Sequence, residues 1–337
     1  MTTHRAVHVQ SAGGPLELAE VETRTPGRGE VRLRVRACGI CGTDRAFVHG
    51  GFPNISWPLT PGHEIAGTIA ELGDGVEDFA VGDRVAVGWF GGCCYHCEPC
   101  RKGFFIHCVN GKVPSWHYPG GYAESVTVPA NALARIPSEL SDVEAAPMGC
   151  AGVTTDNALR HTKALPGDRV AILGVGGLGH LGVQFARAMG FETIAIARGT
   201  GKADDARELG AHHYIDSTAG DVAEALQALG GAAVVLATAA NSQAMADTVG
   251  GLAPQGELVT IGATPEPLNI SPVQLITPGL SVVGHPSGTA KDVEDTMHFA
   301  VLSGVRAWTQ ELPLAQAADG YAALEQGRAH YRTVLTM

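Results

Sequence analysis

Residues 169–179 read Arg169-Val170-Ala171-Ile172-Leu173-Gly174-Val175-Gly176-Gly177-Leu178-Gly179. The first five form a short, mainly apolar run, which predicts a strand covered on both faces. The glycines that follow have the spacing G-x-G-x-x-G, and a helical pattern continues beyond them. In this context glycines permit a tight turn, the backbone can approach a pyrophosphate, and the helix N-terminus faces its charge. We therefore predict a dinucleotide-binding turn at Gly174, Gly176, Gly177, Leu178 and Gly179.

The chain has different patterns on the two sides of this turn. Downstream, apolar runs at 193–197, 232–237 and 257–261 alternate with helical patterns. Such alternation predicts a doubly wound, parallel sheet of the Rossmann type. Upstream, residues 31–36 alternate apolar and charged side chains with period two, as a half-buried strand does. The sequence therefore predicts an α/β protein with a β-rich first half.

The length of the chain, 337 residues, is enough for about two domains of roughly 150 residues each. Hydrophobic residues make up 45% and charged residues 17%, which permits a large core and argues against global disorder. We place the dinucleotide-binding domain at 152–286. The β-rich domain is expected to comprise 1–151 together with 287–337, where the chain returns to it.

Charge and hydropathy argue against two classes of partner. The formal net charge is −11, whereas a nucleic-acid surface needs a basic face. Residues 1–5 lack the start of an apolar signal sequence, and no apolar run approaches the roughly 18 residues that cross a bilayer. We therefore expect a cytoplasmic protein that binds neither nucleic acid nor membrane.

All eight cysteines lie within the first 150 residues, which favours thiolates held for a metal over a disulfide scaffold. Four of them can surround one ion tetrahedrally with no open position, as in a structural zinc site. These four are Cys94, Cys97, Cys100 and Cys108. Coincidental clustering and an iron–sulfur cluster are the alternatives. Cys93 could replace Cys94, although the two-residue spacer favours Cys94.

Three further segments resemble those of the zinc-dependent medium-chain alcohol dehydrogenases. They are Cys38-Gly39-Ile40-Cys41-Gly42-Thr43-Asp44, the signature Gly62-His63-Glu64-x-x-Gly67 that continues to Val85, and Gly149-Cys150-Ala151-Gly152-Val153-Thr154. Matching stretches run from about residue 30 to the C-terminus. The resemblance implies a GroES-like catalytic domain joined to a Rossmann domain, with the four-cysteine run at the position of the family's structural zinc.

Carried over by position, the resemblance implies a second, catalytic zinc bound by Cys41, His63 and Cys150. Two sulfurs and one imidazole leave a position open for water or substrate. Asp44 would orient His63 through its other ring nitrogen. Glu64 would lie behind the metal and could ligate it transiently. Cys38 matches no ligand and is expected to be structural.

The same resemblance implies a reaction in which zinc acts as a Lewis acid on the substrate oxygen and hydride passes between substrate and nicotinamide. Thr43 matches the hydroxyl that passes the alcohol proton onward. Many family members continue this relay with a histidine where this chain has Ala46. The proton could leave through cofactor ribose or water instead, and nothing in the sequence selects the nearby His49. Gly42 is a second departure, since many relatives carry a larger residue there.

The end of the second strand of the Rossmann pattern bears on the choice between NAD and NADP. An NAD site normally has an acidic residue there, which accepts the ribose hydroxyls. This chain has Arg198 at that place, followed by Lys202, and both could bind a 2′-phosphate. We therefore favour NADP, with NAD as the alternative if Arg198 only stacks on adenine. Arg332 matches a family position near the pyrophosphate.

Aromatic residues indicate the kind of substrate. Trp89 and Phe90 resemble pocket-wall positions, and Trp57 could contribute, although core packing explains all three nearly as well. We predict a zinc-dependent alcohol dehydrogenase or aldehyde reductase for primary alcohols, aromatic ones included. His285 could lie near the nicotinamide.

Three other functions compete with this one. A polyol or secondary-alcohol dehydrogenase often has a carboxylate where this chain has Cys150. A zinc-free reductase needs neither cysteine set. A non-catalytic, zinc-stabilised nucleotide-binding protein would not need an open zinc shell or Thr43. By resemblance, we also expect a homodimer or homotetramer that assembles through the nucleotide domain.

Overall fold

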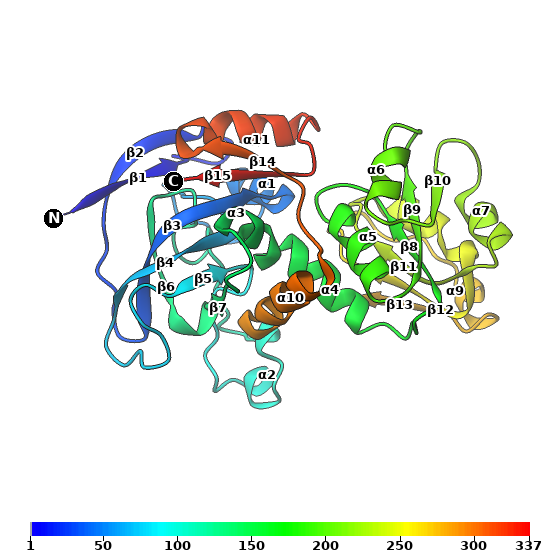
Figure 1. Cartoon of the computed structure of the whole chain (residues 1–337), viewed down its shortest axis with the longest axis horizontal. Helices are drawn as coiled ribbons and strands as arrows, with labels where there is room; N and C mark the ends of the chain where they lie inside the picture. The colour runs from blue at the N-terminus through cyan, green and yellow to red at the C-terminus, as the bar shows by residue number, and fades with distance from the viewer. Residues whose placement is uncertain (1) are drawn as a thin grey trace. The chain divides into compact units, whose positions relative to one another are not determined.

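The structure is a computed structural model that describes residues 2–337. It divides into two compact units (Figure 1). The first unit comprises residues 1–153, 288–302 and 306–337, and the second comprises 154–287 and 303–305. Over the described part of the chain, no helix is long and apolar enough to cross a membrane.

The first unit is built on a mixed sheet in the strand order β14-β15-β3-β4-β5-β7, with β6 paired to β3. A separate hairpin pairs β1 with β2. The strands are β1 (Thr3–His8), β2 (Glu17–Glu22), β3 (Glu30–Ile40), β4 (Ile65–Leu72), β5 (Arg84–Val87), β6 (Ser125–Pro129), β7 (Ala134–Arg135), β14 (Thr309–Pro313) and β15 (Arg332–Thr336). The helices are α1 (Gly42–Val48), α2 (Glu98–Arg101), α3 (Asp142–Ala145), α10 (Ala290–Ser303) and α11 (Ala317–Glu325). Short 3-10 turns cover Phe105–His107, Ala130–Ala132, Ala146–Gly149 and Leu314–Gln316.

Strand β3 is the centre of this sheet, because it pairs with β4, β6 and β15. Its first half alternates buried and more exposed side chains, as its apolar–charged pattern predicts, and its last four residues are all buried. The antiparallel pairing with β4 sets Cys38 opposite Ile65, and the amide of Gly39 donates to the carbonyl of Glu64 at 2.9 Å. The ladder therefore brings the end of β3 beside the segment that precedes β4.

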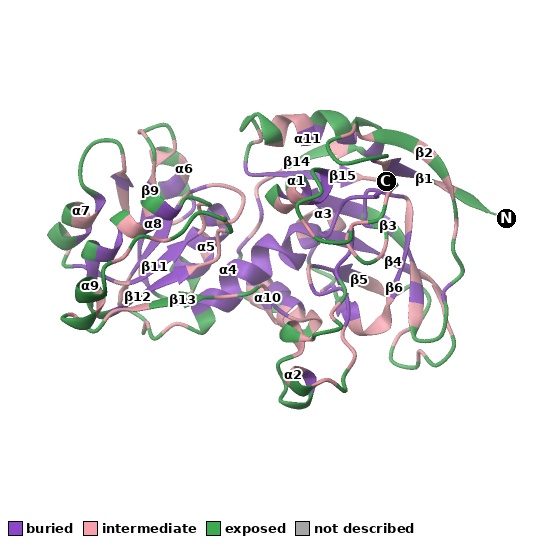
Figure 2. Ribbon diagram, turned by 180° about the vertical axis from the view of Figure 1, so that it is seen from behind, coloured by how far each residue is buried: buried purple, intermediate pink, exposed green. Residues whose placement is uncertain are grey.

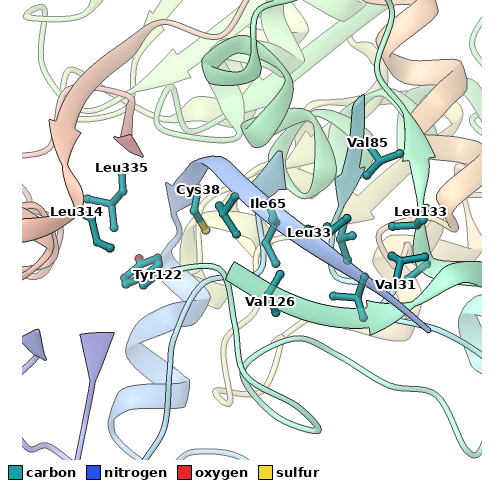
Figure 3. Packing of buried hydrophobic residues seen from close by; sticks show 14 of the residues in the cluster. Val31, Leu33, Cys38, Ile65, Val85, Tyr122, Val126, Leu133, Leu314 and Leu335 are labelled. Atoms are coloured by element: carbon teal, nitrogen blue, oxygen red, sulfur yellow. The ribbon is translucent and has the colours of Figure 1, made fainter. Parts of the chain in front are cut away.

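The core of the first unit lies along these strands (Figure 3). Tyr122 and Cys38 are both completely buried in it, among aliphatic side chains. A Cβ atom added to Gly62 would approach the Tyr122 ring to 2.4 Å and the Cys38 sulfur to 2.7 Å. Gly62 also has a φ of +102°, so both its conformation and its close packing require glycine. Cys38 therefore serves the packing of this segment.

The second unit holds a six-stranded sheet in the order β10-β9-β8-β11-β12-β13, and every neighbouring pair is parallel. The order is that of a doubly wound dinucleotide-binding sheet, which confirms the predicted fold class. The strands are β8 (Arg169–Leu173), β9 (Glu192–Ala197), β10 (His213–Asp216), β11 (Ala232–Ala237), β12 (Leu252–Thr260) and β13 (Ser281–Gly284). Strand β12 begins five residues before the predicted apolar run, with a register shift in its pairing to β11.

Helices cover both faces of this parallel sheet. They are α5 (Gly179–Ala188), α6 (Ala203–Glu208), α7 (Val222–Ala228), α8 (Ser242–Asp247) and α9 (Pro272–Ile276), with α4 (Ala151–Arg160) entering the unit and a 3-10 turn at Val249–Gly251. Gly182 of α5 packs on Ile172, whereas Leu226 of α7 shares a core with Ala171 and Leu173 on the other face. Strands β8 and β11 are consequently almost wholly buried (Figure 2).

Candidate active site and cofactor turn

Three elements of the first unit bring the predicted catalytic zinc ligands together. Cys41 lies between β3 and α1, His63 lies two residues before β4, and Cys150 directly precedes α4. Glu64 is the fourth member of the cluster. The ligand atoms of Cys41, His63, Glu64 and Cys150 all lie within 4.8 Å of one another, and the four residues are buried. Two thiols, an imidazole and a carboxylate form a donor set that suits zinc.

The polar atoms of this cluster fit a metal ion. Nδ1 of His63 is bonded to Oδ1 of Asp44 at 3.0 Å, which leaves Nε2 to face the cluster. This Nε2 is buried, and no other atom of residues 2–337 forms a hydrogen bond with it. A buried polar atom without a partner is costly, so the arrangement favours Nε2 as a metal ligand.

The electrostatics of the cluster also favour a cation. A hydrogen bond from Cys150 is the largest cause that holds the pKa of Cys41 well below its usual range, and the charge of His63 adds to it. Burial lowers the pKa of His63, but the charges of Asp44 and Cys41 outweigh it and raise that pKa well above its ordinary value. The site therefore attracts positive charge, and a metal that binds there displaces protons.

Glu64 forms a buried ion pair with Arg332 of β15. Burial raises the pKa of Glu64 to about 7, against the opposing charge of Arg332. A Cβ atom at Gly39 would meet Oε2 of Glu64 at 2.0 Å, so Gly39 leaves the space that this carboxylate occupies. Arg332, predicted near the pyrophosphate, is thus buried in the first unit against Glu64.

The predicted proton-relay residues occupy different environments. The Thr43 hydroxyl is 3.8 Å from the Cys41 sulfur, and its side chain is half-buried. His49 is exposed, and its Nε2 is paired with Glu325 at 2.9 Å. Of these two residues, Thr43 is the one beside the ligand cluster.

The four-cysteine run closes into a second cluster, with its sulfur atoms within 4.8 Å of one another. The Cys108 sulfur lies 3.5 Å from that of Cys94 and 3.8 Å from that of Cys97. A hydrogen bond from the Asn110 amide is the largest cause that lowers the pKa of Cys94 to about 5. Cys93 lies outside this group, and its carbonyl accepts a hydrogen bond from Asn131.

An aromatic cluster surrounds His63. The rings of Phe47 and Trp89 lie edge-on to the imidazole, at 5.8 and 5.9 Å between centroids. Phe52 contacts Trp89 and also Trp116, and Trp57 packs in the same cluster. Phe90 is placed differently, because it lines a cavity of about 990 Å³ whose lining includes neither His63 nor Trp89.

The glycine turn of the second unit lies between β8 and α5. Gly174 has a φ of +94°, and a Cβ atom at Gly179 would meet the Gly174 carbonyl at 1.7 Å. A Cβ atom at Gly176, by contrast, would meet no described atom within 4 Å. Packing therefore demands glycine at 174 and 179, whereas the open space at Gly176 suits the close approach of a cofactor.

The two predicted cofactor cations lie beside this turn. Arg198 directly follows β9, the parallel neighbour of β8, and is exposed. The ammonium group of Lys202 donates to the Val175 carbonyl within the turn. His285 lies elsewhere in the unit, with its ring 5.4 Å from that of His161.

The sequence analysis did not single out Phe47, which lies beside His63, nor four further residues around these sites. Tyr122 donates to Asp44 at 2.9 Å, and the Thr238 hydroxyl donates to the carbonyls of Leu173 and Gly174. Phe52 and Trp116 extend the aromatic cluster. Phe52, Trp116 and Tyr122 belong to no motif, so only the aromatic content of residues 52–57 and 116–122 could have pointed to them.

Comparisons with known proteins agree with this architecture. Residues 27–138 match the alcohol dehydrogenase GroES-like domain, and residues 177–301 match the zinc-binding dehydrogenase model. The alcohol dehydrogenase notN of Aspergillus sp. (strain MF297-2) is 37% identical over 335 residues, which cover 99% of this chain and 98% of that protein.

Solved structures give the same result. A cinnamyl alcohol dehydrogenase from Sorghum bicolor superposes with a TM-score of 0.91 at 29% identity, over 99% of this chain and 98% of that one. The CAD from Helicobacter pylori complexed with NADP(H) superposes with a TM-score of 0.89 at 26% identity, over 100% and 98%. This chain therefore belongs to the zinc-dependent medium-chain alcohol dehydrogenases, oxidoreductases that act on small alcohols and aldehydes with a nicotinamide cofactor.

Proposed function

We propose that this enzyme interconverts primary alcohols, aromatic ones included, with their aldehydes, and that it prefers NADP to NAD. We further propose two zinc ions per chain, one at Cys41, His63 and Cys150 and one at the four-cysteine cluster. One observation carries the proposal: the Nε2 atom of His63 has no hydrogen-bond partner among the described residues and is buried among two thiols and a carboxylate. Because Glu64 is paired with Arg332, the three donors Cys41, His63 and Cys150 would leave one position open, as in a catalytic rather than a structural zinc site.

When bound, zinc supplies Lewis acidity at the substrate oxygen, and the nicotinamide cofactor supplies or accepts hydride. Asp44 accepts a hydrogen bond from the Nδ1–H group of His63 and so keeps the Nε2 lone pair directed at the cluster. Thr43, half-buried beside Cys41, takes the proton of the alcohol at its Oγ1 and passes it on. Position 46 is alanine, so no side chain at that position would carry this proton onward.

The aromatic cluster supports a preference for aromatic substrates. Trp89 lies against His63 and contacts Phe52, which continues to Trp116. Aromatic rings pack edge-to-face or offset against one another, so a phenyl group next to His63 gains contacts that ethanol lacks. The similar Sorghum bicolor protein is named for cinnamyl alcohol. Trp57 and Trp89 are the pocket residues we favour, whereas Phe90 lines a different cavity that His63 does not line.

The surroundings of the glycine turn support NADP. Arg198 stands where an NAD site has a carboxylate, and Lys202 reaches the turn itself. Two cations can bind a 2′-phosphate by charge-assisted hydrogen bonds, whereas a carboxylate would repel it. The similar Helicobacter pylori enzyme is a complex with NADP(H).

The outer strand of the parallel sheet supports assembly into a homodimer or homotetramer through this unit. Strand β13 is an edge strand, and its Val282 and Val283 are 38% and 39% exposed. Val273 and Ile276 of α9 are 65% and 76% exposed. An apolar edge strand is suited to pairing with a second copy. As domains we propose 1–151 with 287–337 and 152–286.

The test is steady-state oxidation of benzyl alcohol and reduction of benzaldehyde, with NADP(H) and NAD(H) in parallel, on protein of measured zinc content. We expect about two zincs per chain, higher kcat/KM with NADP(H), and loss of turnover in Cys41→Ser but not in Cys93→Ser. Preference for NAD(H) would contradict only the proposed role of Arg198 and would leave the reaction class unchanged. Preference for a secondary alcohol such as 1-phenylethanol would instead favour the secondary-alcohol alternative.

A further inference from the structure

We propose that Tyr122 is a positioning residue of the catalytic metal site, which holds Asp44 so that His63 stays aimed at the metal. The inference rests on the metal site proposed above. Tyr122 belongs to none of the three motifs that carry the ligands, and only the folding of the chain brings it next to Asp44.

The first observation is the hydrogen bonding of Asp44, which is completely buried. Its Oδ1 atom is bonded to Nδ1 of His63 at 3.0 Å. Its Oδ2 atom accepts from the backbone amide of Cys41 at 2.8 Å and from the Tyr122 hydroxyl at 2.9 Å. One carboxylate thus orients two metal ligands, and Tyr122 is the side chain that fixes its second oxygen.

The second observation concerns the backbone around Tyr122. Its amide donates to the Pro61 carbonyl at 2.9 Å, and the amide of Gly121 donates to the Gly62 carbonyl at 2.8 Å. The Tyr122 ring also fills the space next to the Cα atom of Gly62. The segment that carries His63 is therefore held by the backbone of 121–122, while the hydroxyl of the same tyrosine holds the partner of His63.

The proposed role of Tyr122 requires its hydroxyl group and not only its ring. The Tyr122 side chain is completely buried in the core of the first unit (Figure 3), so its hydrogen bond to Asp44 is shielded from bulk water. A phenylalanine would preserve the packing against Gly62 but leave Oδ2 of Asp44 with the Cys41 amide alone. Asp44 then loses part of its restraint, and the alignment of His63 Nε2 with the metal is weakened.

The experiment measures zinc release rather than turnover. Purified enzyme is mixed with excess of the chromogenic chelator 4-(2-pyridylazo)resorcinol, and the release phase that disappears in Cys41→Ser is assigned to the Cys41 site. Removal of an outer partner of a ligand weakens metal binding by about 10- to 100-fold. Because Tyr122 acts one contact further out, we expect Tyr122→Phe to accelerate this phase by about 3- to 10-fold and to leave the four-cysteine phase unchanged.

Two comparisons separate this role from general packing. Tyr118→Phe is the matched control, because the Tyr118 hydroxyl donates to the Gly91 carbonyl and not to Asp44. This variant should release zinc at the wild-type rate. In an Asp44→Ala background, which removes the acceptor of the Tyr122 hydroxyl, Tyr122→Phe should change the Cys41-site phase by less than about 2-fold.

Two results would overturn the inference. One is a Tyr122→Phe protein that loses thermal stability but releases the Cys41-site zinc at the wild-type rate. The other is an undiminished effect in the Asp44→Ala background, which would mean that Tyr122 does not act through Asp44. Wild-type protein with no phase sensitive to Cys41→Ser would contradict the proposed metal site itself, and would be recognised before Tyr122 is tested.

Discussion

The sulfur atoms of Cys41 and Cys150 lie 4.0 Å apart, although 109 positions separate the two residues in the chain. The contact joins the end of β3 to the start of α4, and it places both thiols beside His63. The Nε2 atom of His63 is buried there without a hydrogen-bond partner among the described residues, and a bound metal ion would satisfy it.

Removal of the metal should therefore abolish turnover reversibly. We expect dialysis against a chelator to lower kcat by about 100-fold or more, since loss of Lewis-acid stabilisation costs several kcal/mol. Added zinc should restore activity to the wild-type protein but not to Cys150→Ser. Full activity in protein shown to lack zinc would contradict the proposed site.

Neighbouring cysteines allow a matched test of the proposed structural zinc. We expect Cys94→Ser to lose one zinc per chain and to lower the melting temperature, because a closed zinc site contributes folding free energy directly. Cys93→Ser should keep both ions, since Cys93 lies outside the cluster. Zinc analysis and thermal melting of the two variants test this assignment. Loss of zinc in Cys93→Ser but not in Cys94→Ser would assign Cys93 as the ligand.

The buried pair of Glu64 and Arg332 should couple β4 to the C-terminal strand. Arg332→Met leaves the Glu64 carboxylate buried without its partner, so we expect the free energy of unfolding to fall by about 3–5 kcal/mol. The double variant Glu64→Gln with Arg332→Met should lose less than the sum of the two single variants, because neither charge is then left alone. Strictly additive losses in chemical denaturation would show that the two groups are independent.

Arg198 should decide cofactor preference. A hydrogen bond to a charged group contributes about 1.5–3 kcal/mol, so Arg198→Ala should lower kcat/KM for NADP(H) by about 10- to 100-fold and change that for NAD(H) little. Arg187→Ala is the control, because Arg187 lies at the far end of α5 and pairs with His212. An equal loss with both cofactors would assign Arg198 to adenine stacking.

Local sequence was sufficient wherever neighbouring residues build the feature. The glycine turn follows from residues 169–179, because strand, turn and helix each carry their own signal, and Gly174 and Gly179 have the conformation and packing that only glycine allows. The four-cysteine cluster lies within fifteen residues, so its spacing alone brings the thiols together. The parallel sheet follows from the alternation of apolar runs with helical patterns.

The proposed catalytic cluster could not be predicted from local sequence. Nothing in the spacing of Cys41, His63 and Cys150 joins them, and the sequence singled them out only by family resemblance. Their proximity depends on the pairing of β3 with β4 and on the placement of α4, which are long-range contacts.

Three side-chain contacts depend on tertiary structure alone. They are the contacts of Asp44 with Tyr122, of Glu64 with Arg332 and of Phe52 with Trp116. A buried side chain is matched to whichever atom the fold places within hydrogen-bond or van der Waals reach, and that choice leaves no local periodicity. The sequence by itself determined the two domain types and the kinds of ligand available. The folded chain determined which of those ligands meet, because close packing and the satisfaction of buried polar groups act between segments that are distant in the sequence.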